Sequence, residues 1–345
     1  YTYTVNEENG SYTVTEQTAD HAQAAIGSTN YATLVEAINA AEDGDTVKLL
    51  DDVALTEKLT ISKSITLEGG SYTITGVTDN ADVYFEITGG TLTVNGGTFT
   101  AFGDTAGTVT GAGVFKIPAD STAAKIIANN VTVKQFNRAA FDVRSGSFEL
   151  TSCTIDCDNG QGSRLTKGVV AGYDTSGKVN GQITGGKITG SNSTYEGWSA
   201  NGIEISSGAT VTVAGTEITS MKGGISVARN YGSGKADVTV TDCTINATNY
   251  ALRIFESNNS QEAVEGTSAE LKVNGGSYTG DVRISLRDDA ATDGSSTISI
   301  TGGTFSGITT NGFEAFVPAG YTYTVNEENG SYTVTEQTAD HAQAA

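Results

Sequence analysis

Along most of the chain, apolar and polar residues alternate in short segments that are separated by glycine-containing turns. The most regular segments read LTVNGGTFT at 92–100, LKVNGGSYT at 271–279 and ISITGGTFS at 298–306. A period of two is that of a β-strand with one buried face, and Gly supplies the backbone conformations that a tight turn requires. The pattern therefore predicts an all-β chain built from repeated strand–turn–strand units.

One apolar position, two residues after each turn, recurs about every 29 residues. It is occupied in turn by Tyr72, Phe99, Val133, Ile155, Ile188, Ile218, Ile245, Tyr278 and Phe305. In each rung, an upstream strand carries two apolar residues with one polar residue between them. The pairs are Phe85/Ile87, Phe115/Ile117, Phe141/Val143, Ile203/Ile205, Ile225/Val227, Leu252/Ile254 and Ile284/Leu286, and the residues between them are Glu86, Lys116, Asp142, Glu204, Ser226, Arg253 and Ser285. This alternation predicts apolar side chains pointing inward and polar ones pointing outward.

Rungs of this length, with three short strands each and no intervening helix, predict a coiled parallel β-solenoid of about nine rungs. Stacked about 4.8 Å apart, the rungs would span roughly 40 Å. A β-sandwich is the alternative architecture, but it would not be expected to keep one three-strand register in every unit.

Both ends of a solenoid expose pairing edges and an apolar interior, so each end needs a cap. Thr33 and Glu36 form a capping-box pattern ahead of an apolar stripe, which predicts a short helix over about 33–43 with Gly44 at its C′ position. At the other end, Phe313, Phe316 and Val317 are expected to cover the last rung.

The first 25 residues, 1–25, are repeated letter for letter at 321–345. This identity predicts that the chain is one 320-residue unit of a tandem array followed by the start of the next unit, the alternative being an artificial duplication of a tail. Each copy carries an Asn-Gly pair between alternating segments, which predicts a β-hairpin at the junction. Such a hairpin would serve either as a flexible spacer or as a stiff contact that packs on the next cap, and the lack of Gly/Ser/Pro linker composition favours packing.

The predicted organisation has five parts. These are a junction hairpin at 1–25, an N-terminal cap and first strand at 26–58, a parallel β-helix at 59–308, a C-terminal cover at 309–320 and the second junction hairpin at 321–345.

This combination resembles a known family. YATLVEAINAAEDGDTVKLLDDV, then ISKSITLEGGSYTITG, then GGTF or GGSY rungs and a Tyr/Thr-rich hairpin are similar to large repetitive surface proteins of Gram-positive gut bacteria. Those proteins are pectate-lyase-like, right-handed, single-stranded β-helices that act as adhesins or stalks. The resemblance covers essentially the whole chain and implies a right-handed coil, secretion and attachment to the cell wall, with an extracellular or cell-surface location.

Composition narrows the classes of partner. The formal net charge of −21 makes nucleic-acid binding a poor expectation, because phosphate backbones repel an acidic chain. No apolar run is long enough to cross a bilayer, so no membrane insertion is expected of this segment. The 43 Gly and 2 Pro fit tight turns and strands that are hydrogen-bonded on both sides.

Catalytic chemistry has few candidates. The two His residues, His21 and His341, lie in the duplicated ends, so the predicted solenoid lacks the commonest general acid or base. The best cluster of carboxylates and arginines is Asp288 and Asp289 with Arg283 and Arg287, while Arg253 lies one rung earlier. A solvated loop with local ion pairs explains the same residues, so the cluster is a weak candidate for a catalytic or sugar-acid site.

Metal and sugar sites are also weakly indicated. Asp156, Asp158 and Asn159 resemble part of a calcium loop, but the segment is one residue short and lacks the distal Glu, and the same residues suit an ordinary turn. Calcium is therefore the one cofactor that the sequence suggests. Four aromatic residues in or beside predicted loops are candidates for stacking on sugars, with packing over the loop as the alternative. They are Tyr195, Trp198, Tyr173 and Tyr231.

Cys153, Cys157 and Cys243 are expected to be small buried hydrophobes rather than zinc ligands or a disulfide. Cys153 and Cys243 fall in one column three rungs apart, about 14 Å at the strand spacing, which exceeds disulfide reach.

The first functional hypothesis is therefore a non-catalytic repeat unit of a long extracellular stalk, filament or adhesin, whose partners are identical units end to end and host or microbial glycans or proteins. A carbohydrate-binding module using Tyr195 and Trp198 and a polysaccharide lyase or hydrolase are the alternatives.

Overall fold

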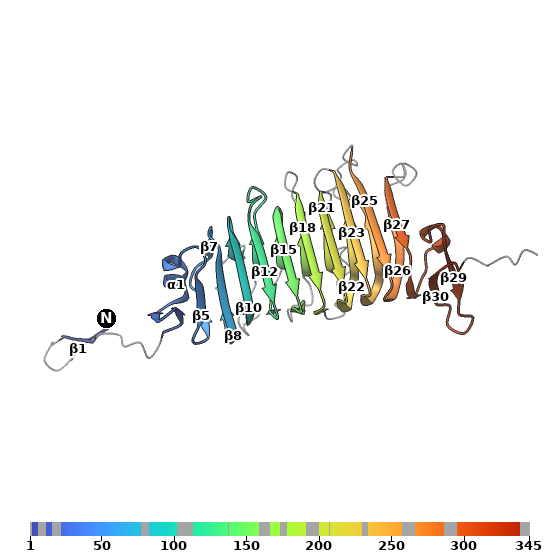
Figure 1. Ribbon diagram of the computed structural model, residues 1–345. Coiled ribbons are helices and arrows are strands. Elements are labelled where there is room, and N and C mark those ends of the chain that lie inside the picture. Colours follow the sequence, from blue (N-terminus) through green and yellow to red (C-terminus); the bar gives the residue numbers. More distant parts are fainter. Residues whose placement is uncertain are drawn as a thin grey trace, which may run out of the picture.

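The computed structural model describes residues 22–76, 83–101, 113–136, 138–158, 166–172, 178–190, 200–206, 208–229, 234–256, 266–285 and 295–338, and the backbone of strands β1 (Thr2–Val5) and β2 (Tyr12–Thr15). The described solenoid is an elongated parallel β-helix with a helix at one end and a hairpin at the other (Figure 1). This confirms the predicted fold class.

Three parallel ladders run along the solenoid, one for each strand of a rung. The first ladder contains β7 (Leu59–Ile61), β9 (Val83–Ile87), β11 (Gly113–Ile117), β14 (Ala139–Val143), β17 (Lys167–Ala171), β20 (Asn201–Ser206) and the C-terminal halves of β22 (Glu217–Ala228), β24 (Thr244–Phe255) and β26 (Ser277–Ser285).

The second ladder contains β5 (Thr46–Leu49), the N-terminal halves of β8 (Ile65–Thr75) and β10 (Thr91–Thr100), β12 (Lys125–Asn129), β15 (Gly146–Thr151), β18 (Val179–Thr184), β21 (Ala209–Ala214), β23 (Lys235–Thr241), β25 (Ser268–Asn274) and β27 (Ser296–Ile300). The third contains β6 (Val53–Ala54), β13 (Thr132–Lys134), β16 (Thr154–Asp156), β19 (Lys187–Thr189), β28 (Gly303–Ser306) and the remaining halves of the long strands.

The predicted apolar columns are confirmed at most rungs. In the third ladder, Phe99 pairs with Val133, and the column continues in register to Phe305. Tyr72 is wrong as its first member, because Ile74 pairs with Phe99. The turn within β8 contains two more residues than the turn within β10, so the residue that pairs with Phe99 comes two positions later than expected. The register shifts between the two strands lie in this turn.

The upstream columns contain a second error and an omission. Leu252 and Ile254 pair with Val282 and Ile284 rather than with Ile284 and Leu286, so Arg283, not Ser285, continues the polar position between them. A further rung, Val169 and Ala171, pairs with Ile203 and Ile205. The sequence pattern did not identify it, because Ala171 is a weak hydrophobic signal.

Aromatic and aliphatic side chains fill the interior. Phe115 lies among Phe85, Phe99 and Phe141, with ring centroids 5.2, 4.9 and 5.0 Å away, and all four are buried. Where two ladders meet closely, Gly is required. A Cβ atom on Gly202 would lie 2.6 Å from Cγ2 of Ile218, closer than real Cβ atoms approach other atoms.

The N-terminal cap is built on the predicted capping box. Helix α1 spans Leu34–Ala40, where Thr33 accepts from the backbone N–H of Glu36 and the Glu36 carboxylate accepts from that of Thr33. The helix buries Leu34, Ala37 and Ile38. It ends at Ala40, short of the predicted residue 43, and its C-cap is Ala41, so the prediction of Gly44 as the C′ residue is wrong. Gly44, with φ 92°, lies instead in the turn before β5.

Two antiparallel strands complete this end. Strands β3 (Ala24–Ile26) and β4 (Thr29–Tyr31) pair with each other, and β3 also pairs with β5. The last four residues of the duplicated segment, Ala22–Ala25, therefore lead directly into the first layer of the solenoid.

The C-terminal end is closed by a 3₁₀ turn, η2 (Phe313–Phe316), and by a hairpin of β29 (Tyr321–Val325) and β30 (Tyr332–Glu336). Phe313 is 1% exposed, in agreement with the predicted cover. The hairpin packs on the solenoid that precedes it, because β30 pairs with β28. This contact with the preceding solenoid was not predicted from the sequence, and packing of the hairpin on a following cap stays a prediction.

Candidate functional site

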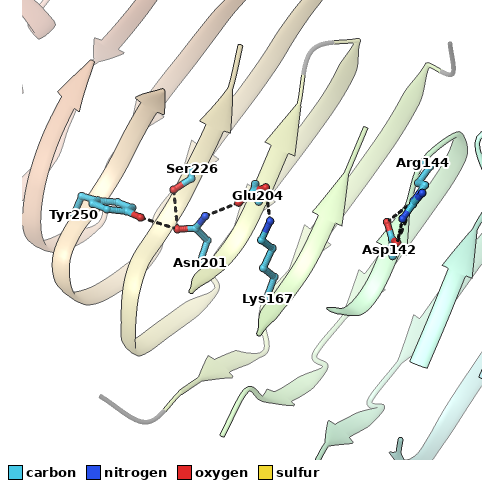
Figure 2. A network of polar contacts seen from close by, with 7 residues as sticks. All are labelled: Asp142, Arg144, Lys167, Asn201, Glu204, Ser226 and Tyr250. Carbon is cyan, nitrogen blue, oxygen red and sulfur yellow. Dashed lines mark hydrogen bonds and ion pairs between the residues drawn. The ribbon is translucent and has the colours of Figure 1, made fainter. Parts of the chain in front are cut away.

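A cluster of buried, mutually hydrogen-bonded polar groups lies on the first ladder and is called the polar network here. It comprises Lys167, Asn201, Glu204, Ser226 and Tyr250, from four successive rungs (Figure 2). Asn201, Glu204, Ser226 and Tyr250 are each at most 2% exposed. As predicted, Glu204 and Ser226 occupy the polar positions between the inward-facing apolar pairs, but both are buried rather than exposed to solvent.

Glu204 is held at both carboxylate oxygens. The Lys167 ammonium donates to Oε1 at 2.6 Å, and the Asn201 amide Nδ2 donates to Oε2 at 2.6 Å. The Asn201 Oδ1 accepts from the hydroxyls of Ser226 at 3.1 Å and Tyr250 at 3.0 Å. Every member thus has a partner, as burial in a medium of low dielectric requires.

Tyr250 reaches Asn201 across an intervening strand because residue 223 is Gly. Gly223 pairs with Asn201 on one side and with Tyr250 on the other. A Cβ atom there would clash with the Tyr250 ring and with the Asn201 amide oxygen. The absence of a side chain at Gly223 therefore allows the hydrogen bond between Tyr250 and Asn201.

Two arginines continue this face toward the C-terminal end. Arg253 pairs in register with Arg283, and its guanidinium lies 3.9 Å from the ring centroids of both Tyr250 and Phe255. Stacking on aromatic rings stabilises a guanidinium that has lost part of its hydration. Burial lowers the pKa of Arg253 and raises the pKa of Tyr250, which keeps the tyrosine hydroxyl protonated.

Asp142 lies on the same ladder, closer to the N-terminal end. Asp142 receives two-nitrogen contact from Arg144, with Nε–Oδ1 at 3.2 Å and Nη2–Oδ2 at 3.0 Å (Figure 2). Asp142 also lines a small surface depression together with Lys116 and Arg138.

The residues nominated from sequence are only partly placed. Arg283 lies on β26 with its Nη1 4.0 Å from Asp281 Oδ2. Asp156 ends β16, and its Oδ1 accepts from the backbone N–H of Asp158 at 3.0 Å, which is ordinary Asx-turn geometry. The other candidates lie outside the described residues, namely Arg287, Asp288, Asp289, Tyr173, Tyr195, Trp198, Tyr231 and Asn159. The calcium, sugar-binding and carboxylate–arginine hypotheses therefore remain predictions.

Among the residues that the structure describes, no group of three or more His, Cys, Asp or Glu is arranged to hold a metal ion. Within the same part of the chain, none of the helices has the length and apolar character needed to cross a membrane.

The sequence pattern nominated no member of the polar network as a site residue. Glu204 and Ser226 were visible only as the polar residues of one column, while Lys167, Asn201 and Tyr250 carried no local signal. Their contacts span up to 49 residues of sequence, so only the register between rungs brings them together.

The three cysteines are free and buried, as predicted. Burial raises the pKa of all three thiols, which suppresses the reactive thiolate. We therefore expect a thiol reagent such as Ellman's reagent to leave the native protein unmodified and to label all three residues after unfolding in denaturant. Rapid labelling of even one thiol in the native protein would contradict this placement.

A second buried carboxylate joins the last rungs to the C-terminal cover. Asp281, 3% exposed, accepts hydrogen bonds from the backbone N–H groups of Thr309 and Thr310 at 2.9 Å and from the Thr310 hydroxyl at 2.7 Å. Burial alone would raise the pKa of Asp281, but these donors outweigh burial and hold the pKa below its ordinary value of 3.8.

Replacing Asp281 with asparagine should lower the free energy of unfolding by about 1–3 kcal/mol at pH 7, because the charged acceptor of these donors is lost. Since the folded pKa is depressed, the carboxylate's contribution is present above about pH 4 and declines as the pH falls through the folded value. Denaturant titrations of both proteins at neutral and acidic pH should therefore show a gap that narrows in acid. An equal gap at both pH values would refute the assignment.

Comparison with known proteins adds no family to this description. A scan against protein-family models matches none of them to the chain, and a search of curated proteins gives no match.

Proposed function

We propose that the chain is a non-catalytic structural unit of a long extracellular stalk, filament or adhesin on a bacterial surface. The observation that carries the proposal is the duplicated segment. Its copy at 321–345 contributes the hairpin that closes this solenoid, and its copy at 1–25 ends in Ala24 and Ala25 of strand β3. One sequence thus supplies the last element of one solenoid and the first strand of another, which is the property that a tandem array needs.

The polar network supports a structural role in preference to a catalytic one. Glu204 is 2% exposed and both of its oxygens are occupied by protein donors. A general acid or base must reach the proton that it transfers, and a buried, fully bonded carboxylate is poorly suited to that task.

The net charge of −21 fits the same role. Repeated along an array, it would keep a long rod soluble and discourage sideways pairing between sheet edges.

Peptide mapping of the complete protein recovered from bacterial cell walls tests this proposal. The array predicts that HAQAA at 341–345 is followed by IGSTNYATLVEAINA, as the first copy is in this chain. A different sequence after this segment, or recovery of the protein only from the cell interior, would overturn the proposal.

A further inference from the structure

The chain contains two copies of one hairpin sequence that differ in what they contact. Strands β1 and β2 pair with the same register as β29 and β30, so that Tyr3 faces Val14 as Tyr323 faces Val334. In the described part of the chain, β1 and β2 form a two-stranded sheet by themselves, whereas β30 also joins the large sheet. The first copy therefore has the sequence of a docking element without the docking contact of the second.

The docked copy shows what the hairpin binds. Strand β30 pairs antiparallel with β28, placing Tyr332 opposite Phe305 and Val334 opposite Gly303. Tyr332 packs against Phe313 with ring centroids 4.4 Å apart and tilted planes, and Val334 is 2% exposed. The recognised surface thus consists of the edge of β28 that β30 covers and the aromatic residues Phe305 and Phe313, and we call it the terminal edge.

The first copy, the N-terminal hairpin, carries the same residues that contact the terminal edge in the docked copy. Tyr12 and Val14 correspond to Tyr332 and Val334, and no residue differs between the two copies. Main-chain pairing with an exposed strand edge gives affinity, while alternate side chains in fixed contacts give specificity. Both requirements are met equally by either copy.

We propose that the terminal edge is a binding surface for the N-terminal hairpin of a second copy of this chain. The interaction is head to tail, because the hairpin lies at one end of the chain and the terminal edge lies at the other. Such a heterologous contact leaves one free hairpin and one free edge at the ends of every assembly, so it can propagate. The inference deepens the proposed array by naming the surfaces that meet, but it concerns separate chains and is tested on them.

Backbone hydrogen bonds at both ends of a short segment limit the distance between two units that are joined in one chain. In the docked copy, the Gln337 N–H is bonded to the Gly320 carbonyl. In the first copy, Gln23 is bonded to Tyr31 and Leu50 of the N-terminal cap. Since Gln337 corresponds to Gln17, only residues 18–22 separate the two anchored positions. Five residues extend at most roughly 20 Å, so neighbouring units would be closely tethered.

In the unaltered chain, the C-terminal hairpin should win the competition for the terminal edge. It is linked covalently to that edge, and a short linker gives an effective concentration on the order of millimolar. The unaltered chain is therefore expected to be monomeric at micromolar concentration, and the test must weaken the C-terminal copy alone.

The deciding experiment uses three full-length variants in sedimentation velocity over a range of concentrations. The first carries Tyr332→Ser and Val334→Asp, the second carries Tyr12→Ser and Val14→Asp, and the third carries all four substitutions. We expect the first variant to form concentration-dependent species with at least twice the 35.5 kDa mass of the chain. The second and third should remain monomeric.

Each alternative outcome is informative. A folded but monomeric first variant would overturn the proposal, as would equal association of the first and third variants, because that would indicate an exposed apolar edge without hairpin recognition. A peptide of the sequence YTYTVNEENGSYTVTEQ, residues 1–17, supplies a second measurement. It should dissociate the assemblies of the first variant, and failure to do so at saturating concentration would also count against hairpin exchange.

Discussion

Replacing Glu204 with alanine should lower the free energy of unfolding by about 3–5 kcal/mol, which is the usual cost of removing one partner of a buried ion pair. The variant leaves the Lys167 ammonium and the Asn201 amide without the acceptors they now contact at 2.6 Å. Lys167 and Glu204 are 15% and 2% exposed, so water replaces those acceptors poorly. Denaturant unfolding of the purified chain measures the loss.

The solvent-exposed pair of Lys187 and Glu217 provides the matched control. Its ions lie 2.9 Å apart, but the two side chains are 45% and 43% exposed. Replacing Glu217 with alanine should therefore cost only about 0–1 kcal/mol. A Lys167→Met and Glu204→Leu double variant should be more stable than the Glu204→Ala single variant, because it leaves no unpaired buried ion.

The outcome also bears on function. A residue maintained for binding or catalysis at the expense of stability can be replaced without loss of stability, and such replacements often stabilise the fold. A Glu204→Ala variant as stable as the parent would contradict the structural role and would make the polar network a candidate ligand site.

Replacing Phe115 with alanine should also cost about 3–5 kcal/mol, the range observed when a buried aromatic side chain is truncated. Phe115 contacts three other phenylalanines from the neighbouring rungs and from the facing ladder. The rungs are held on both sides by main-chain ladders, so the backbone cannot easily collapse into the space left behind. The Val325→Ala variant is a suitable control, since Val325 is 47% exposed.

A solenoid is stabilised by contacts between nearest neighbours, so the damage should also be local. Hydrogen exchange measured by mass spectrometry should show the largest loss of protection in β9, β11 and β14, with little change near β27 and β28. Uniform loss of protection along the whole chain, or a cost below about 1 kcal/mol, would contradict this description of the core.

How far the sequence alone predicts this fold depends on how locally each feature is encoded. The alternation around Phe115 and Phe141 and the capping box of Thr33 and Glu36 are short-range patterns, and the structure contains both. Their physical causes, strand periodicity and helix capping, operate within a few residues.

Register between rungs is less local, and the errors arise there. The turn of β8 contains two more residues than that of β10, so the count from the Gly-Gly pair led to Tyr72 instead of Ile74. On β26, the pairing of Leu252 with Val282 accommodates irregularities that no single-strand pattern reveals.

The hydrogen bonds of the polar network could not be predicted from the sequence, because they too depend on the register between rungs. Asn201 and Tyr250 meet only because Gly223 on the strand between them has no side chain. Likewise, the hairpin was predicted from its Asn-Gly turn, but its contact with β28 depends on the position of the last rung, which follows from the whole fold.

The central claim is that the chain is a rod-forming unit, and small-angle X-ray scattering from a protein with two consecutive 320-residue units tests it most directly. The ten described strands of the second ladder, stacked about 4.8 Å apart, extend roughly 40 Å. Two units joined by a short tether should therefore give a maximum dimension about twice that of the single chain. The pair-distance distribution should be that of an elongated particle. A two-unit protein as compact as one unit, with the solenoids folded back on each other, would contradict the claim.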